Sequence, residues 1–304
     1  MLRDPIRFMV PMHSKKRRPF MKTLLIGMVA LTTLFAPLTR GTSQTLTVKA
    51  ANTLLSLNEK WAQAYEAKHP GVTVNVTGEE TPAAIADLAG KKTDIIILPR
   101  AIHYKEAQSC EAAFGRRPAE SKLAVSGAAV FLNTNNPVKV LTYDELSDLF
   151  QGQTKNWKEL DGGLDQAVFV YAQPTNTVLG ELFNEEVLNG RGFPDAVHLR
   201  HDSDVVKAVA TDPGAIGISA LAPAEEAQLV SIKRVRSSTP VIPTEEKIAR
   251  RIYPISRYVF SYVNPGGSPD AIKAYLDWIR SEEGQQVARD AGFYALPPLL
   301  RSNP

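Results

Sequence analysis

The 304-residue chain lacks several features that would define other protein classes. It has a single cysteine, Cys110, so it can form no internal disulfide, and no cysteine follows the apolar N-terminal segment as a lipid-attachment site. Cys110 lies in a polar, helix-like stretch, so we interpret it as a structural thiol. The motifs of nucleotide-binding loops, dinucleotide folds and serine hydrolases are also missing. These absences argue against an enzyme, and we expect no cofactor.

Metal and nucleic-acid sites have little support in the sequence. His198 and His201 lie three residues apart, with Asp202 and Asp204 close by. We interpret this short, Arg-containing segment as a polar loop leading into a helix, and a metal site is the alternative interpretation. We therefore expect no bound metal. No basic stripe with interleaved aromatic residues is present, so we also expect no nucleic-acid partner.

One apolar run is present near the N-terminus. Leu24 to Ala36 carries no charge and follows the basic stretch Lys15 to Arg18. A basic segment followed by an apolar run this short is typical of a secretory signal, because spanning a bilayer takes about 20 residues. We therefore expect residues 1–43 to be a signal-peptide region, cleaved between Thr39 and Gln44, and the protein to be periplasmic. An uncleaved membrane anchor is the alternative, and Met21 is a candidate start.

The net charge changes sign when this region is removed. The whole chain has a formal charge of +3, but residues 1–43 hold eight Lys or Arg and one acid. The remainder has 27 basic and 31 acidic residues, a net charge of −4. The basic balance therefore belongs to the N-terminal segment and indicates nothing about a polyanionic partner.

After residue 44 the pattern alternates between strands and amphipathic helices, which predicts an α/β fold with largely parallel sheets. Thr142 to Glu145 forms a capping box, and Thr81-Pro82 reads as an N-cap followed by proline. The expected strands are 46–50, 72–76, 95–98, 124–132, 167–171, 215–218 and 257–263. The expected helices begin near residues 54, 81, 143, 178, 204, 269 and 282.

In three places a strand ends in a small polar cluster that begins a helix. These clusters are Ala51-Asn52-Thr53, Gly78 to Thr81, and Pro174 to Thr177. Helix N-termini present free N–H groups and the positive end of the helix dipole, which favour anions. Each cluster alone is interpreted as an ordinary cap, but three in one chain favour a shared site at the carboxyl ends of the strands.

The order and spacing of several motifs resemble the PstS-like phosphate-binding proteins of ABC importers, which have the periplasmic binding protein type II fold. The resemblance covers about residues 45–300. The motifs that carry it are NNPV at 135–138, LT at 141–142, LFQG at 149–152, NW at 156–157, VATDPGAIG at 209–217, YPISR at 253–257 and SEEGQ at 281–285.

The resemblance implies a ligand site, from which this sequence departs. Tyr171 stands where the family has a phosphate-pairing arginine, and Arg100 follows the position of a family acid or serine. Glu79 and Glu80 lie beside the second turn, where they either complement the helix dipole or point inward and oppose an anion. We predict that Arg100 supplies the nearby positive charge. The expected ligand-binding residues are Asn52, Thr53, Thr81, Arg100, Tyr171, Thr175, Asn176 and Thr177.

The resemblance also implies two α/β lobes joined by two crossover strands, near 128–132 and 257–262. The expected lobes are 45–134 plus 256–304, and 135–255. A monomer that binds phosphate or a related small oxyanion, and delivers it to an ABC permease and its ATPase, is the implied function. A sensing or binding protein outside transport, with a changed or lost ligand, is the alternative. An enzyme on this fold ranks last, because no nucleophile–base pair is visible.

Overall fold

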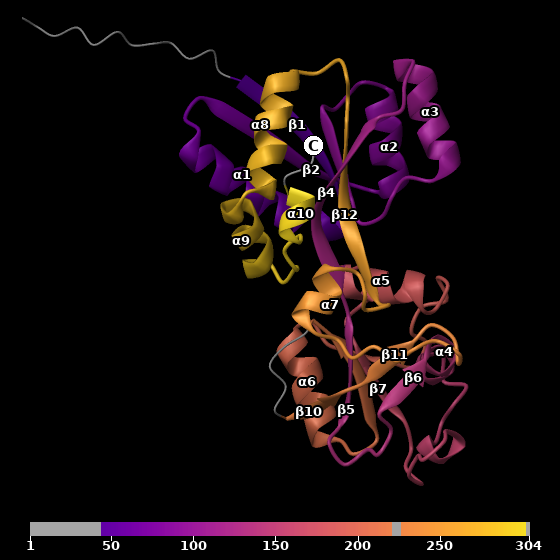
Figure 1. Cartoon of the computed structure of the whole chain (residues 1–304). Coiled ribbons are helices and arrows are strands. Elements are labelled where there is room, and N and C mark those ends of the chain that lie inside the picture. Colours follow the sequence, from indigo (N-terminus) through magenta and orange to yellow (C-terminus); the bar gives the residue numbers. More distant parts are fainter. Residues whose placement is uncertain (1–43, 221–225, 302–304) are drawn as a thin grey trace, which may run out of the picture. The chain divides into compact units, whose positions relative to one another are not determined.

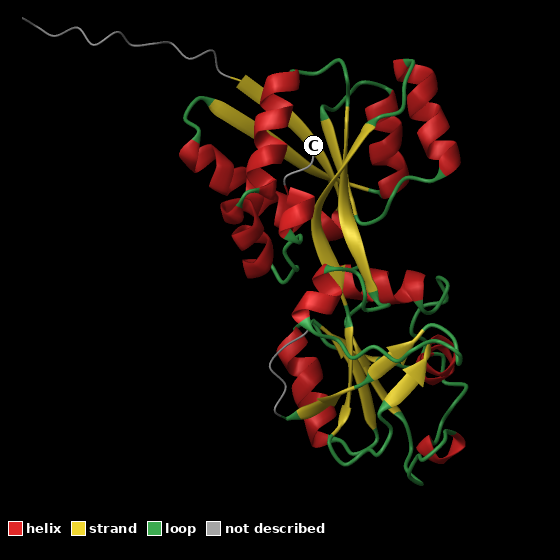
Figure 2. Ribbon diagram, in the orientation of Figure 1, coloured by secondary structure: helices red, strands yellow, loops and turns green. Residues whose placement is uncertain are grey.

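The computed structural model describes residues 44–220 and 226–301, within the compact unit that begins at Gly41. The predicted signal-peptide region lies outside the described residues. Within them, strands and helices form two five-stranded sheets and one two-stranded sheet (Figure 1, Figure 2). We call each five-stranded sheet with its helices a lobe.

The first sheet has the strand order β2-β1-β3-β12-β4. Its strands are β1 (Gln44–Ala51), β2 (Val72–Glu79), β3 (Ile95–Leu98), β4 (Ala119–Gly127) and β12 (Ser256–Val263). Its helices are η1 (Asn52–Leu54), α1 (Leu55–Lys68), α2 (Thr81–Ala89), α3 (Tyr104–Phe114), α8 (Pro269–Arg280), α9 (Glu282–Asp290) and α10 (Pro298–Arg301).

This sheet is covered on both faces. Ile95 and Ile97 of β3 point into the core formed with α1, α8 and α9, while Ile96 and Leu98 point into the core formed with α2 and α3. All four side chains are fully buried, as the unbroken apolar run in the sequence predicts for a strand between two helical layers.

The second sheet has the strand order β10-β5-β9-β7-β8, and β6 pairs with β11 beside it. The strands are β5 (Ala129–Asn133), β6 (Val140–Thr142), β7 (Phe169–Ala172), β8 (Val197–His198), β9 (Ala215–Ser219), β10 (Ala227–Leu229) and β11 (Ser231–Lys233). The helices are α4 (Tyr143–Phe150), η2 (Trp157–Glu159), α5 (Val178–Glu186), α6 (Asp202–Thr211) and α7 (Glu245–Ala249). Helices α4, α5 and α7 share the core on one face, and α6 packs on the other.

The chain passes between the lobes twice. The strand expected at 124–132 is divided by Ala128, so β4 belongs to the first sheet and β5 to the second. On the return, Ile255 packs in the second lobe's core and Val259 in the first. The two passages meet where the N–H of Ala128 donates to the carbonyl of Ile255 at 3.1 Å. The α/β fold with two crossover strands is therefore confirmed.

The expectation of largely parallel sheets holds only in part. β1 pairs in parallel with β2 and β3, and β7 with β8 and β9. The antiparallel pairs in the two large sheets all include a crossover strand, β12 in the first lobe and β5 in the second. β12 enters the first sheet from the second lobe, and β5 enters the second sheet from the first lobe. Each runs antiparallel to both of its neighbours in the sheet.

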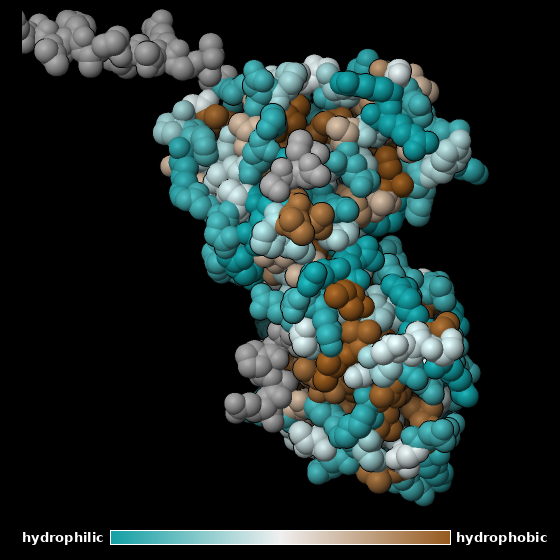
Figure 3. All heavy atoms as spheres, in the orientation of Figure 1, coloured by the Kyte–Doolittle hydropathy of each residue, from teal (hydrophilic) through white to brown (hydrophobic). Residues whose placement is uncertain are grey.

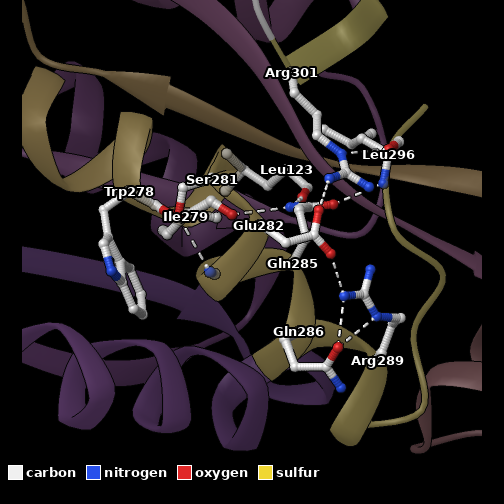
Figure 4. Close-up of polar contacts among 11 residues, drawn as sticks. Leu123, Trp278, Ile279, Ser281, Glu282, Gln285, Gln286, Arg289, Leu296 and Arg301 are labelled. Carbon is white, nitrogen blue, oxygen red and sulfur yellow. Dashed lines mark hydrogen bonds and ion pairs between the residues drawn. The ribbon is translucent and has the colours of Figure 1, made fainter. Parts of the chain in front are cut away.

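A buried amide holds the C-terminal segment against the first sheet (Figure 4). The register of β4 against β12 jumps from Ala124 to Lys122, which leaves Leu123 as the extra residue of a β-bulge. Gln285, which is fully buried, donates to the carbonyls of Leu123 at 2.8 Å and Ile279 at 2.9 Å. Its own carbonyl accepts from the N–H of Leu296 at 2.6 Å. One side chain thus links β4, α8 and the segment after α9.

Among the described residues, no helix is long and apolar enough to cross a membrane. On the face shown in Figure 3, apolar side chains gather over the second lobe, whereas hydrophilic residues cover most of the first. The exposed large apolar residues near β6 and β11 include Val140, Val235 and Ile242.

Candidate functional site

The first polar turn links β1 to α1 through the short helix η1. Asn52 is exposed, and its Nδ2 donates to Glu80 Oε1 at 2.8 Å. Thr53 is half-buried, and its Oγ1 donates to Glu181 Oε2 at 2.6 Å. Glu181 belongs to α5 of the second lobe. The hydroxyl of Thr53 therefore carries a hydrogen bond between the lobes.

The second turn differs by one residue from the predicted cap. Glu80, not Thr81, occupies the N-cap position of α2, so Thr81 and Pro82 are the first two helical residues. Both added carboxylates already have partners, because Glu79 accepts from Lys49 Nζ at 3.1 Å and Glu80 accepts from Asn52. Each carboxylate is thus engaged within the first lobe.

Arg100 follows β3 and is bound within its own lobe. Its Nη1 and Nη2 donate to the two carboxylate oxygens of Glu106, each at 2.9 Å. These bonds raise the pKa of Arg100 and lower the pKa of the Glu106 carboxyl. Glu106 also accepts from the N–H of His103, the N-cap of α3, at 2.6 Å. The guanidinium predicted to supply the free positive charge is thus engaged by a carboxylate.

The third turn joins β7 to α5. Thr175 and Asn176 are exposed, while Thr177 is the N-cap of α5 and accepts from the N–H of Gly180 at 3.2 Å. Gly180 lies so close to the turn that an added Cβ would fall 2.1 Å from the carbonyl oxygen of Pro174. This close approach fixes the first turn of α5, which carries Glu181.

Tyr171 is directed elsewhere. Its hydroxyl donates to Asp212 Oδ2 at 3.3 Å, and its ring packs against the core beneath α6. Asp212 precedes β9, which runs parallel to β7. The hydroxyl therefore reaches toward the end of the sheet opposite the turn at Thr175 to Thr177.

A cluster that the sequence did not single out lies where Thr53 meets α5. Arg257, near the start of β12, has a side chain only 4 % exposed. Its Nη1 donates to Glu185 Oε2 at 2.5 Å, and its Nη2 lies 3.5 Å from Glu181 Oε2. Thr53, Glu181, Glu185 and Arg257 are hereafter the Arg257 cluster. It joins η1 of the first lobe, α5 of the second lobe and a crossover strand.

The Glu181 carboxylate is in an environment that opposes its charge. Burial raises the pKa of Glu181 above its ordinary value of 4.5, and Glu185 acts in the same direction. Arg257, the hydroxyl of Thr53 and the more distant Arg100 favour the ionised form. The first-lobe and crossover groups around Glu181 are therefore those that would stabilise an oxyanion.

Part of the Arg257 cluster is visible as local patterns in the sequence. Arg257 ends the YPISR motif, which carries part of the family resemblance, but it is not among the predicted ligand residues. Glu181 and Glu185 lie four residues apart, a spacing that places both on one face of α5. Their contact with Arg257 joins residues 72 or more positions apart, which helical periodicity cannot foresee.

Metal binding gains no support from the arrangement. Within residues 44–220 and 226–301, no group of three or more His, Cys, Asp or Glu side chains could hold a metal ion. Asp202, one of the residues near His198 and His201, instead accepts from Ser219 at 2.9 Å and from Gln173 at 2.9 Å.

Solved structures share this fold. A possible phosphate-binding protein from Planctomyces limnophilus superposes with a TM-score of 0.76 at 23 % identity, covering 86 % of this chain and 96 % of that one. An ABC-type phosphate transport receptor from Vibrio cholerae gives a TM-score of 0.67 at 22 % identity, covering 83 % and 100 %. The predicted two-lobed fold is thus confirmed.

Relatives found by sequence also match over most of the chain. The chain is 25 % identical to the protein SphX of Synechococcus elongatus over 287 residues, covering 90 % of this chain and 85 % of that protein. It is 26 % identical to the phosphate-binding protein PstS of Pseudomonas aeruginosa over 275 residues, covering 84 % of each. The resemblance seen in the sequence is confirmed. The family model described as the PBP superfamily domain matches residues 36–283, and the chain belongs to this family.

Proposed function

We propose that this protein is the solute-binding component of an ABC-type importer and binds phosphate or a related small oxyanion. Relatives named as phosphate-binding proteins span most of the chain. The observation that carries the proposal is the Arg257 cluster, where a hydroxyl of one lobe, a helix of the other and a buried guanidinium meet. The donors in this cluster are the Thr53 hydroxyl and the Arg257 guanidinium, and such donors favour a small anion over a neutral sugar.

The proposed ligand groups come from both lobes. Thr53 is the member of the predicted set that belongs to the cluster, and η1 packs against α5. The exposed Thr175 and Asn176 lie in the turn before α5, from which they can add donors. We propose Arg257 in the role first given to Arg100, because Glu106 engages Arg100 on both nitrogens. We further propose that the protein is a monomer, which binds and releases its ligand and catalyses no reaction.

The ligand is tested by thermal unfolding in the presence of candidate compounds. A ligand that binds only the folded chain, at about 100 times its dissociation constant, stabilises it by ~2.7 kcal/mol. We expect phosphate to raise the melting temperature, with arsenate, sulfate and molybdate compared beside it. Small sugars and amino acids are the controls. A rise with a control ligand, and none with any oxyanion, would contradict the proposed ligand class.

Export is a second part of the proposal. The basic stretch and the apolar run Leu24 to Ala36 support a cleaved signal and a periplasmic location. Intact-mass analysis of a periplasmic extract should give a chain beginning between Thr39 and Gln44. A chain that keeps Leu24 to Ala36 and sediments with membranes would support an uncleaved anchor instead.

A further inference from the structure

The guanidinium of Arg257 has one edge bound and one edge open. Nη1 is held by Glu185, whereas Nε and Nη2 have no hydrogen-bond acceptor among the described residues, although both are buried. These two nitrogens lie on the same edge of the planar group and point their hydrogens in parallel. Such a fork matches two oxygens of a carboxylate or of a tetrahedral oxyanion. A buried donor pair without an acceptor therefore indicates the place of an anion.

The chain's own carboxylate lies beside this open edge. Glu181 Oε2 is 3.5 Å from Nη2 of Arg257, too long for a hydrogen bond, and it accepts from Thr53 at 2.6 Å. The same oxygen thus faces a hydroxyl donor from one side and a guanidinium from the other. This is the arrangement of donors that a bound oxyanion would meet.

The charges around the open edge of Arg257 show how the Glu181 carboxylate affects anion binding. Arg100 is paired with Glu106, so its charge is compensated within its own lobe. Arg257 faces both Glu181 and Glu185, which leaves the cluster with more acidic than basic groups. An incoming anion would be repelled unless one carboxylate moves away or is neutralised. Glu185 keeps a close bond to Nη1, whereas Glu181 makes only the long contact with Nη2.

We propose that Thr53 and the Nε–Nη2 edge of Arg257 form the oxyanion site, and that Glu181 is a built-in competitor for it. An arriving oxyanion displaces the Glu181 carboxylate from this position and takes its hydrogen bond from Thr53. Glu181 therefore sets the affinity of the protein for its ligand. This inference rests on the proposed function, because the displacing ligand is the oxyanion proposed above.

The test is a calorimetric titration with inorganic phosphate of the natural protein and of Glu181→Gln. The amide keeps the shape of the side chain and can still accept from Thr53, but it carries no charge. If the carboxylate blocks the site in about nine of ten molecules, removing its charge tightens binding about tenfold. Glu186→Gln is the matched control, since it removes one charge from the same helix outside the cluster, and it should leave affinity within about twofold.

The role of the fork is tested in the same background. Arg257→Lys combined with Glu181→Gln keeps the positive charge but loses the two parallel donors, so most of the gained affinity should disappear. Circular dichroism of each variant shows whether it is folded. If Arg257→Lys does not fold, Thr53→Val in the Glu181→Gln background tests the other half of the site, with the same expected loss.

The outcomes separate the inference from the proposed function. Phosphate binding that is unchanged or weaker in Glu181→Gln than in the natural protein overturns the competitor role and leaves the function standing. Binding by Glu181→Gln alone supports the competitor role but contradicts phosphate binding by the natural protein. Absence of phosphate binding by the natural protein and by Glu181→Gln overturns both. Unchanged affinity on losing the fork removes Arg257 from the site.

Discussion

Replacing Gln285 with alanine is expected to lower the free energy of unfolding by about 3 kcal/mol, one of the largest losses from a single change in this chain. The substitution leaves three buried groups without partners: the carbonyls of Leu123 and Ile279 and the N–H of Leu296. Each such group costs about 1–3 kcal/mol when no water can replace the lost bond. The urea concentration at the midpoint of unfolding measures the loss.

The neighbouring residue gives a matched control. Gln286 lies on the same helix, but its bonds to Asp290 and Arg289 are exposed. Gln286→Ala should therefore shift stability by less than about 0.5 kcal/mol, since solvent replaces these bonds. Equal losses for the two alanine variants would show that Gln285 does not anchor the bulge at Leu123.

Replacing Arg257 with glutamine is expected to cost about 3 kcal/mol of folding stability. The change leaves Glu181 and Glu185 facing each other without the cation that both contact. Breaking a buried ion pair from one side typically costs about 3–5 kcal/mol, and the lower value applies because the Glu185 side chain is 45 % exposed.

Two further variants check that the loss comes from unpaired charge. Arg250 pairs with Glu246 on the surface, where the two side chains are 58 % and 73 % exposed, so Arg250→Gln should cost under about 1 kcal/mol. Adding Glu181→Gln and Glu185→Gln to Arg257→Gln should restore much of the stability, because no uncompensated charge remains. If the triple variant is no more stable than Arg257→Gln, packing of the arginine stem is the dominant contribution.

Local patterns predicted the elements of the fold well. The apolar run at 95–98 is a strand with those bounds, and the capping box at Thr142 forms as expected, with Thr142 accepting from the N–H of Glu145 at 3.2 Å. Both depend on neighbours along the chain. The cap at Thr81 was misplaced by one residue, because Glu80 adopts the extended backbone conformation of an N-cap residue and Thr81 already begins the helix.

Local sequence patterns predicted less of the candidate site. Helix starts at Thr53 and Thr177 are visible in the sequence, but the partners of these residues are not. Thr53 and Glu181 are separated by 128 positions, and only the folded chain brings them together. Arg100 looked available because it follows a strand end, yet Glu106 engages it within the same lobe. No sequence pattern places Arg257 at the site, because it lies in a crossover strand, away from the three polar turns.

Phosphate binding is measured by isothermal titration of inorganic phosphate into the purified natural protein in a phosphate-free buffer. We expect saturable binding of about one phosphate per chain, since one guanidinium fork defines the site. Lactose in place of phosphate should give only heat of dilution. Absence of saturable binding at ligand concentrations up to about 1 mM, where even a binding free energy of about −4.1 kcal/mol would be detected, would show that the protein is not a phosphate receptor.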